Sequence, residues 1–210
     1  KNKAMESAIQ FYLPIEIVRD IAADGQIPAH AGQTVFATFL CTDLEGYTSF
    51  AENIDPETLN KTMRGYYDTI FRPIRKREGI ISDVIGDSMM ALWATKGPDS
   101  ATKRRACRCA LEIDSALSRF WAENAPGVRL PTRMGIHCGY VHIGNIGGAD
   151  HYEYRATGDV VNTVSRIENL NKYLGARILV SGQAVDGLKD FVLRRLGAFL
   201  LSGKKTPVEI

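Results

Sequence analysis

Two aspartates occupy similar places in the first half of the chain, and together they are suited to binding a metal ion. Asp43 follows the apolar stretch Val35–Leu40, and Asp87 follows Gly86 in the middle of a second apolar stretch, Ile80–Trp93. If both stretches are strands and the strands pair, the two carboxylates come together. Neighbouring carboxylates provide the oxygen ligands that Mg²⁺ needs when phosphates fill its remaining positions. The alternative is that each aspartate is only a cap or turn residue.

A second polar group lies on a predicted helix over 159–174. Asn162 and Arg166 are four residues apart and therefore share one face of that helix. An amide and a guanidinium on one face suit a phosphoryl group that gains negative charge during a reaction. A solvent-exposed pair without a ligand is the alternative.

The residues that follow Asp43 are also suited to phosphate. Gly46, Tyr47 and Thr48 lead into a short predicted helix. The first N–H groups of a helix have no partner within it, and the helix dipole favours negative charge there. We therefore expect these three residues to contact phosphate oxygens.

The apolar pattern predicts the elements that position these side chains. The stretch 35–40 indicates a strand covered on both faces, and a hairpin over 80–93 turns at Gly86–Asp87, where a positive φ is expected. Asp55 and Pro56 mark the start of a helix that Pro73 should bend or end. Helices are expected over 56–74, 101–121, 159–174 and 181–188, and further strands over 132–138, 141–146, 177–180, 192–201 and 208–210.

The resulting order is β-α-β-β-α-β with extra strands at the end. This order is typical of an α+β protein with a ferredoxin-like core, in which an antiparallel sheet carries helices on one face. Residues 1–33 are predicted to form a helical connector, with a linker over 25–33. Because Pro14 interrupts the pattern over 1–25, this part is predicted to form either one helix or two shorter ones. Residues 34–210 are predicted to form the main domain.

Composition and charge narrow the possible partners. The 210 residues are 45% hydrophobic and 24% charged, as in an ordinary globular domain, and the net charge of +2 argues against a nucleic-acid partner. No apolar stretch approaches the roughly 20 residues of a membrane span, and no signal peptide is recognised. The four cysteines suggest neither a disulfide framework nor a zinc site, which favours a reducing compartment. Because the chain starts at Lys1, we interpret it as a piece of a longer protein.

Four phrases of the sequence resemble the catalytic domain of class III nucleotidyl cyclases. They occur in that family's order and at its spacing, and they are Phe39–Thr48, Ile85–Ala91, Gly135–Gly139 and Gly158–Arg166. The resemblance covers residues 34–210 and is closest to bacterial adenylate cyclases that carry a sensor and membrane helices upstream. It implies the class III cyclase fold and a cytoplasmic output domain of a membrane-bound signalling protein.

The resemblance also implies a role for each candidate residue. Asp43 and Asp87 correspond to aspartates that bind two Mg²⁺ or Mn²⁺ ions, whereas Asn162 positions the ribose and Arg166 stabilises the transition state. Family members work as head-to-tail dimers, in which one subunit supplies the aspartates and the other the Asn–Arg pair. The chain is therefore expected to convert ATP to cyclic AMP and pyrophosphate as a homodimer with two composite sites.

The remaining positions of the family pattern are less regular here. Lys204, or alternatively Lys205, matches the lysine that holds the triphosphate, and His137 is interpreted as structural. Asp83 stands where adenylate cyclases commonly have lysine, and Arg155 stands where they commonly have aspartate or threonine. This pair could read adenine or guanine, or it could form a salt bridge that leaves the base unread.

Three alternative functions follow. A carboxylate at the position of Asp83 is also what guanylate cyclases of the family use, so GTP is the first alternative substrate. A catalytically silent regulatory domain is the second, although the complete set of candidate catalytic and metal-binding residues argues against it. A diguanylate-cyclase-type domain is the third, and it would need a Gly-Gly-acidic-acidic-Phe phrase that the hairpin Val84–Ser88 does not supply.

Overall fold

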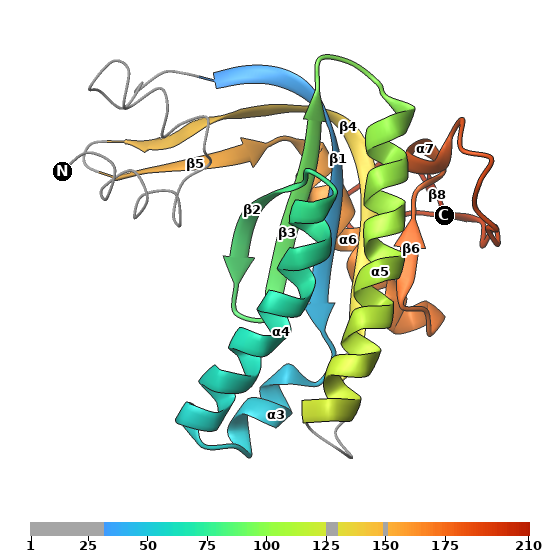
Figure 1. Cartoon of the computed structure of the whole chain (residues 1–210). Coiled ribbons are helices and arrows are strands. Elements are labelled where there is room, and N and C mark those ends of the chain that lie inside the picture. Colours follow the sequence, from blue (N-terminus) through green and yellow to red (C-terminus); the bar gives the residue numbers. More distant parts are fainter. Residues whose placement is uncertain (1–31, 125–129, 149–150) are drawn as a thin grey trace.

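The computed structural model describes residues 32–124, 130–148 and 151–210 (Figure 1). The predicted helix over 1–25 lies outside these residues, as does most of the predicted linker over 25–33. Within the described ranges, no helix is both long enough and apolar enough to cross a membrane.

A six-stranded sheet forms the centre of the molecule, and most neighbouring strands run antiparallel. Five strands follow the order β2-β3-β1-β4-β5, and β6 pairs with β4 in parallel. The bounds of these strands are β1 (Gly32–Leu44), β2 (Ile80–Ile85), β3 (Ser88–Thr95), β4 (Thr132–Gly148), β5 (His151–Thr157) and β6 (Ile178–Val180).

Two long helices, α4 (Pro56–Lys76) and α5 (Ser100–Asn124), lie side by side on one face of the sheet (Figure 1). They bury their apolar sides against one face of β1, where the apolar residues are Phe36, Leu40 and Leu44. The order β1-α4-β2-β3-α5-β4, with strands arranged β2-β3-β1-β4, confirms the predicted ferredoxin-like core.

A third helix, α6 (Asp159–Leu174), covers the opposite face, so the expectation of helices on one face only was incomplete. Val160 and Val164 pack there against the other alternate residues of β1. The approach to β4 is close, because a Cβ atom at Gly135 would lie only 2.5 Å from the backbone nitrogen of Glu168. A strand that is apolar at almost every position requires cover on both faces, which explains why α6 is needed.

Several boundaries differ from the prediction. The α4 helix begins as expected, with Asp55 accepting a hydrogen bond from the Thr58 N–H, but it continues three residues past Pro73. β4 is one strand rather than two, because Gly139 pairs with Ala37 within the ladder and does not interrupt it. β5 was not predicted as a strand.

The last part of the chain has less regular structure than expected. A four-residue helix, α7 (Gly182–Val185), replaces the predicted helix over 181–188. The predicted strand over 192–201 is reduced to β7 (Ala198–Phe199), which pairs with β8 (Val208–Glu209). One further short helix, α3 (Tyr47–Glu52), follows β1 directly.

Candidate functional site

Asp43 and Asp87 lie together at one end of the central strands. Asp43 is the penultimate residue of β1, and Asp87 forms the β2–β3 turn with Gly86, whose φ of 62° is positive as predicted. The Ser88 hydroxyl donates a hydrogen bond of 3.1 Å to Asp43 Oδ1, which holds the turn beside the strand end. Partial burial, followed by the charge of Asp43, raises the pKa of Asp87, as expected for two carboxylates placed close together.

A buried arginine stands opposite Asp43. Arg133 of β4 is the cross-strand partner of Asp43, and its Nη2 contacts Asp43 Oδ2. The Nε of the same guanidinium lies 3.3 Å from Oε1 of Glu168 on α6. The side chains of Arg133 and Glu168 are 9% and 4% exposed, so the guanidinium contacts two carboxyl groups inside the protein. Burial, followed by the charge of Asp43, raises the pKa of Glu168 to about 7.

Neither Arg133 nor Glu168 was singled out from the sequence. Arg133 occupies the polar position of the alternating strand 132–138, and the β1–β4 register would have placed it opposite Asp43. Glu168 has no sequence signal, because its burial depends on the close approach of α6 at Gly135.

The turn that carries Asp87 is also held from α4. The Tyr67 hydroxyl donates a hydrogen bond to the carbonyl oxygen of Gly86. Burial, followed by the charge of Asp87, raises the pKa of Tyr67 to about 12, so the phenol remains a donor at neutral pH. The helical spacing assigned Tyr67 to the apolar side of its helix, and only the structure shows this polar contact.

The predicted phosphate-binding residues lie at the start of α3. Gly46 is the N-cap with a φ of 78°, and Tyr47 and Thr48 form the first turn. Among the described residues, no side chain caps this end of the helix. Its first N–H groups therefore lack a side-chain acceptor, which is the condition under which a helix start binds an anion.

Asn162 and Arg166 lie one turn apart on α6, where Asn162 is exposed and Arg166 is half-buried. The Arg166 guanidinium lies close to the backbone of Gly203, where an added Cβ would be 3.2 Å from Nη2. In the part of the chain that the structure describes, no hydrogen bond or ion pair connects Asn162 or Arg166 with Asp43 or Asp87. Without such a contact, these residues fall into two groups, which we call the carboxylate half-site (Asp43, Asp87) and the α6 half-site (Asn162, Arg166).

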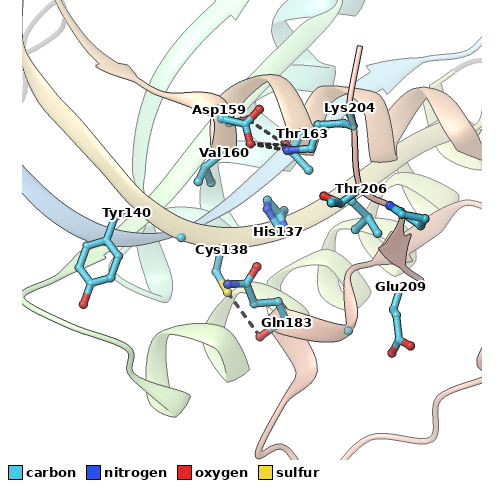
Figure 2. Close-up of a pocket in the computed structure, with 14 residues that line it drawn as sticks. His137, Cys138, Tyr140, Asp159, Val160, Thr163, Gln183, Lys204, Thr206 and Glu209 are labelled. Carbon is cyan, nitrogen blue, oxygen red and sulfur yellow. Dashed lines mark hydrogen bonds and ion pairs between the residues drawn. The ribbon is translucent and has the colours of Figure 1, made fainter. Parts of the chain in front are cut away.

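A cavity of about 500 Å³ lies beside the first turns of α6 (Figure 2). Lys204 borders it, and its Nζ contacts Asp159 Oδ2 and donates a hydrogen bond of 2.9 Å to Thr163 Oγ1. Of the two candidate lysines, Lys204 lines this cavity and Lys205 does not. The cavity lies between β4, the first turns of α6, α7 and the segment 204–209, and neither Asp43 nor Asp87 lines it.

His137 also lines this cavity, but its contacts fit the structural role predicted for it. Its Nδ1 lies 2.8 Å from Ser181 Oγ in a buried position. Burial, followed by the nearby charge of Lys204, lowers the pKa of His137 to about 4. The ring is therefore neutral near pH 7.

Asp83 and Arg155 form an ion pair between the two edge strands β2 and β5. Asp83 Oδ1 lies 3.0 Å from Arg155 Nη2, and Arg155 Nε lies 3.0 Å from Glu153 Oε2. Burial raises the pKa of Asp83 against the opposing effect of Arg155. The two side chains are 23% and 40% exposed, so a ligand can reach the pair.

The carboxylate half-site fits a divalent cation in part. Among the described residues there is no cluster of three or more His, Cys, Asp and Glu side chains placed to hold a metal ion. Asp43 and Asp87 nevertheless place two hard oxygen donors near each other, and Asp43 is 20% exposed. Such oxygens suit Mg²⁺ or Mn²⁺ when a phosphate completes the coordination.

Comparison with known proteins gives a consistent result. The family model described as the adenylate and guanylate cyclase catalytic domain matches residues 30–209. Adenylate cyclase 1 of Rhizobium meliloti is 33% identical over 214 residues, which cover 100% of this chain and 32% of the relative. An adenylate cyclase of Anabaena cylindrica is 29% identical over 222 residues, which cover 100% of this chain and 43% of the relative. The chain thus spans less than half the length of these two relatives.

Solved structures agree on the fold. An adenylyl cyclase from P. aeruginosa superposes with a TM-score of 0.77 at 24% identity, over 85% of this chain and 93% of that one. A bacterial light-regulated adenylyl cyclase gives 0.84 at 21% identity, over 99% of this chain and 60% of that one. A guanylyl cyclase superposes with a TM-score of 0.73 at 28% identity, over 85% of this chain and 91% of that one.

Proposed function

Because the chain belongs to the family of adenylate and guanylate cyclase catalytic domains and has their class III fold, we propose that it converts ATP to cyclic AMP and pyrophosphate. The observation that supports this most directly is the placement of Asp43 and Asp87 at a strand end and the adjoining turn. Two Mg²⁺ or Mn²⁺ ions bound there would lower the pKa of the ribose 3′-hydroxyl and neutralise the leaving pyrophosphate.

The reaction is an intramolecular displacement at phosphorus. The 3′-oxygen forms a bond to the α-phosphorus, the bond from the α-phosphorus to the bridging oxygen of pyrophosphate breaks, and the hydroxyl proton passes to solvent. Asp43 and Asp87 would hold the metal ions, and Arg133 adds positive charge beside them. The N–H groups at the start of α3, from Gly46 to Thr48, would bind phosphate oxygens.

Among the described residues no hydrogen bond or ion pair joins the two half-sites, which supports a homodimer with composite sites. A second subunit would bring its α6 half-site to the carboxylate half-site of the first. Asn162 would orient the ribose, and Arg166 would stabilise the charge that develops on the α-phosphate. Lys204 would bind the triphosphate after exchanging its contact with Asp159 for phosphate oxygens.

Exposed apolar side chains offer a surface for that dimer. Val84 and Ile85 of β2 are 45% and 64% exposed, and Tyr140 and Ile146 of β4 are 57% and 38% exposed. Apolar surface of this kind is typical of protein interfaces. The family relatives are longer than this chain, and we propose that it acts as a cytoplasmic output domain that a connector over 1–33 joins to an upstream sensor or membrane domain.

The ion pair of Asp83 and Arg155 supports a second candidate, a guanylate cyclase. Asp83 can accept hydrogen bonds from the guanine ring N–H and amine, and Arg155 can donate to its carbonyl oxygen. The deciding experiment offers ATP and GTP together with Mg²⁺ or Mn²⁺ and identifies the products. We expect mainly cyclic AMP. An excess of cyclic GMP would reverse the assignment, and no product from a folded dimer would indicate a silent regulatory domain.

A further inference from the structure

Glu168 lies beside the carboxylate half-site, and it is not one of the two proposed metal ligands, Asp43 and Asp87. Its carboxylate is 4% exposed and lies 3.3 Å from Arg133 Nε, whereas Arg133 Nη2 contacts Asp43. A third carboxylate, Glu45, lies 3.7 Å from Arg133 Nη1, but it is 56% exposed. The guanidinium therefore stands between one fully buried carboxylate and two that solvent can reach.

A divalent cation at Asp43 would compete with this arginine. Two positive groups against one carboxylate repel each other, so the contact of Arg133 with Asp43 must weaken when the ion binds. A buried guanidinium that loses its counter-charge is costly, and the exposed Glu45 is screened by water. Glu168 is the buried partner that can continue to neutralise Arg133.

The position of Glu168 is fixed by the backbone. Arg133 and Gly135 lie on the same face of β4, and Gly135 leaves no room between β4 and the backbone of Glu168. Three residues further along α6, Asn171 donates a hydrogen bond of 3.0 Å to the carbonyl oxygen of Met134. These two contacts hold the carboxylate of Glu168 at Nε of Arg133, next to the Nη2 that contacts Asp43.

We propose that Glu168 is a positioning residue for metal binding. It keeps the buried Arg133 guanidinium paired with a carboxylate when a divalent cation binds the Asp43 carboxylate. The inference rests on the proposed function, because it takes Asp43 to be a metal ligand. Without Glu168, Arg133 has Asp43 as its remaining close counter-ion and opposes the incoming cation more strongly.

The test measures Mn²⁺ binding without nucleotide, by the electron paramagnetic resonance signal of the free ion. We expect Glu168→Gln to weaken Mn²⁺ binding about tenfold, a size typical of groups coupled in one network. Glu112→Gln is the matched control, because Glu112 also pairs with an arginine, Arg77, but joins α5 to the end of α4. This control should bind Mn²⁺ like the parent.

A double-mutant cycle shows whether the effect passes through Arg133. We expect Arg133→Gln to bind Mn²⁺ more tightly than the parent, since the competing cation is gone, and the further change Glu168→Gln to have little effect in that background. An equal loss on Glu168→Gln in both backgrounds would mean that its charge acts on the ion directly, and it would overturn the proposal.

Two further outcomes separate the proposal from the function on which it rests. If Asp43→Asn abolishes Mn²⁺ binding while Glu168→Gln leaves it unchanged, the role of Glu168 is wrong and the metal site stands. If Asp43→Asn leaves Mn²⁺ binding unchanged, the metal site itself is wrong. Should Glu168→Gln fail to fold by circular dichroism, Arg133→Gln alone decides: binding no tighter than in the parent overturns the competition.

Discussion

Asp43 and Asp87 share one chemical role in the proposed reaction but differ in what surrounds them. We expect Asp43→Asn and Asp87→Asn each to lower cyclic-nucleotide formation by at least about a hundredfold, because a lost metal ion removes several kcal/mol of charge stabilisation. Asp43→Asn also removes one of the charged partners of the buried Arg133 and should lower the melting temperature. Burial disfavours the ionised form of Asp87. The melting temperature of Asp87→Asn should therefore equal or exceed that of the parent.

Product assays and thermal unfolding of the two variants check this prediction. A near-normal rate for either variant in Mg²⁺ or Mn²⁺ would remove that aspartate from the site.

Base choice is a second property that we propose to depend on single side chains. The exchange Asp83→Lys with Arg155→Asp installs the charge order that is common in adenylate cyclases. If the pair contacts the purine, each single change should lower the rate more than the double change, because a single change leaves like charges side by side. The double variant should prefer ATP over GTP more strongly than the parent.

Initial rates with each nucleotide measure that preference. If the single and double variants all match the parent in rate and in the ratio of ATP to GTP use, neither side chain contacts the base.

His137 gives the protein a pH-dependent stability. Its pKa is about 4 in the folded protein against an ordinary value of 6.5, so between these values the unfolded chain binds a proton that the folded chain does not. Stability is therefore fully present above pH 6.5 and falls as the pH is lowered to 4, by about 3 kcal/mol at most. We expect His137→Gln to remove this slope in urea unfolding measured across that range.

The matched control for this measurement is His142→Gln, at an exposed position of the same strand. An unchanged slope in His137→Gln, or the same loss of slope in His142→Gln, would contradict the assignment.

At the scale of elements, β4 and α6 are in close backbone contact at Gly135. A methyl group at Gly135 would lie 2.5 Å from the backbone nitrogen of Glu168 and 2.7 Å from the carbonyl oxygen of Val164. Backbone atoms cannot turn aside as a side chain can, so α6 must shift. We expect Gly135→Ala to lower the free energy of unfolding by about 1–3 kcal/mol and to lower activity.

Gly97→Ala serves as the control, because no atom lies within 4 Å of its added methyl group. Chemical denaturation of both variants should separate them, and equal stabilities would show that the contact tolerates a side chain.

The elements that the sequence predicts well are those with a long periodic pattern. The α6 helix has the predicted bounds of 159–174, and the hairpin around Gly86–Asp87 was recognised from its two apolar runs and its glycine. β5 was missed because it is a short edge strand that follows a glycine-rich segment and carries charged residues such as Glu153 and Arg155. The apolar periodicity of α6 does not indicate which face of the sheet the helix covers.

The same reasoning explains what could be predicted of the site. Asp43 lies at the end of β1, and Asp87 lies in the turn that leads into β3. Because β3 pairs with β1, the order of the strands is enough to bring the two residues together. The contact of Arg133 with Asp43 depends on the register of β1 on β4. Glu168 needs, in addition, the approach of a helix from the other face, which no local pattern predicts.

At the scale of the whole molecule, the proposed composite sites make a clear prediction for mixtures. Asp43→Ala and Arg166→Ala proteins should each be inactive, and mixing them should restore activity. The mixed dimer has one site with both defects and one with neither, so random exchange of subunits gives about a quarter of the parent rate.

Assays after demonstrated subunit exchange provide the measurement. No recovery under those conditions would mean that each site lies within one chain.

The uninterrupted first strand has a mechanical consequence for such an assembly. From Gly32 to Asp43 it extends roughly 36 Å, at about 3.3 Å per residue, and it is paired with β4 along its whole length. A strand held in this way cannot slip by one residue without turning Asp43 to the other face, so a displacement at Gly32 reaches Asp43 only as a rigid tilt. With this lever arm, a tilt of about 2° moves Asp43 by about 1 Å relative to a second subunit, and a misplacement of that size is enough to lower a rate about a hundredfold.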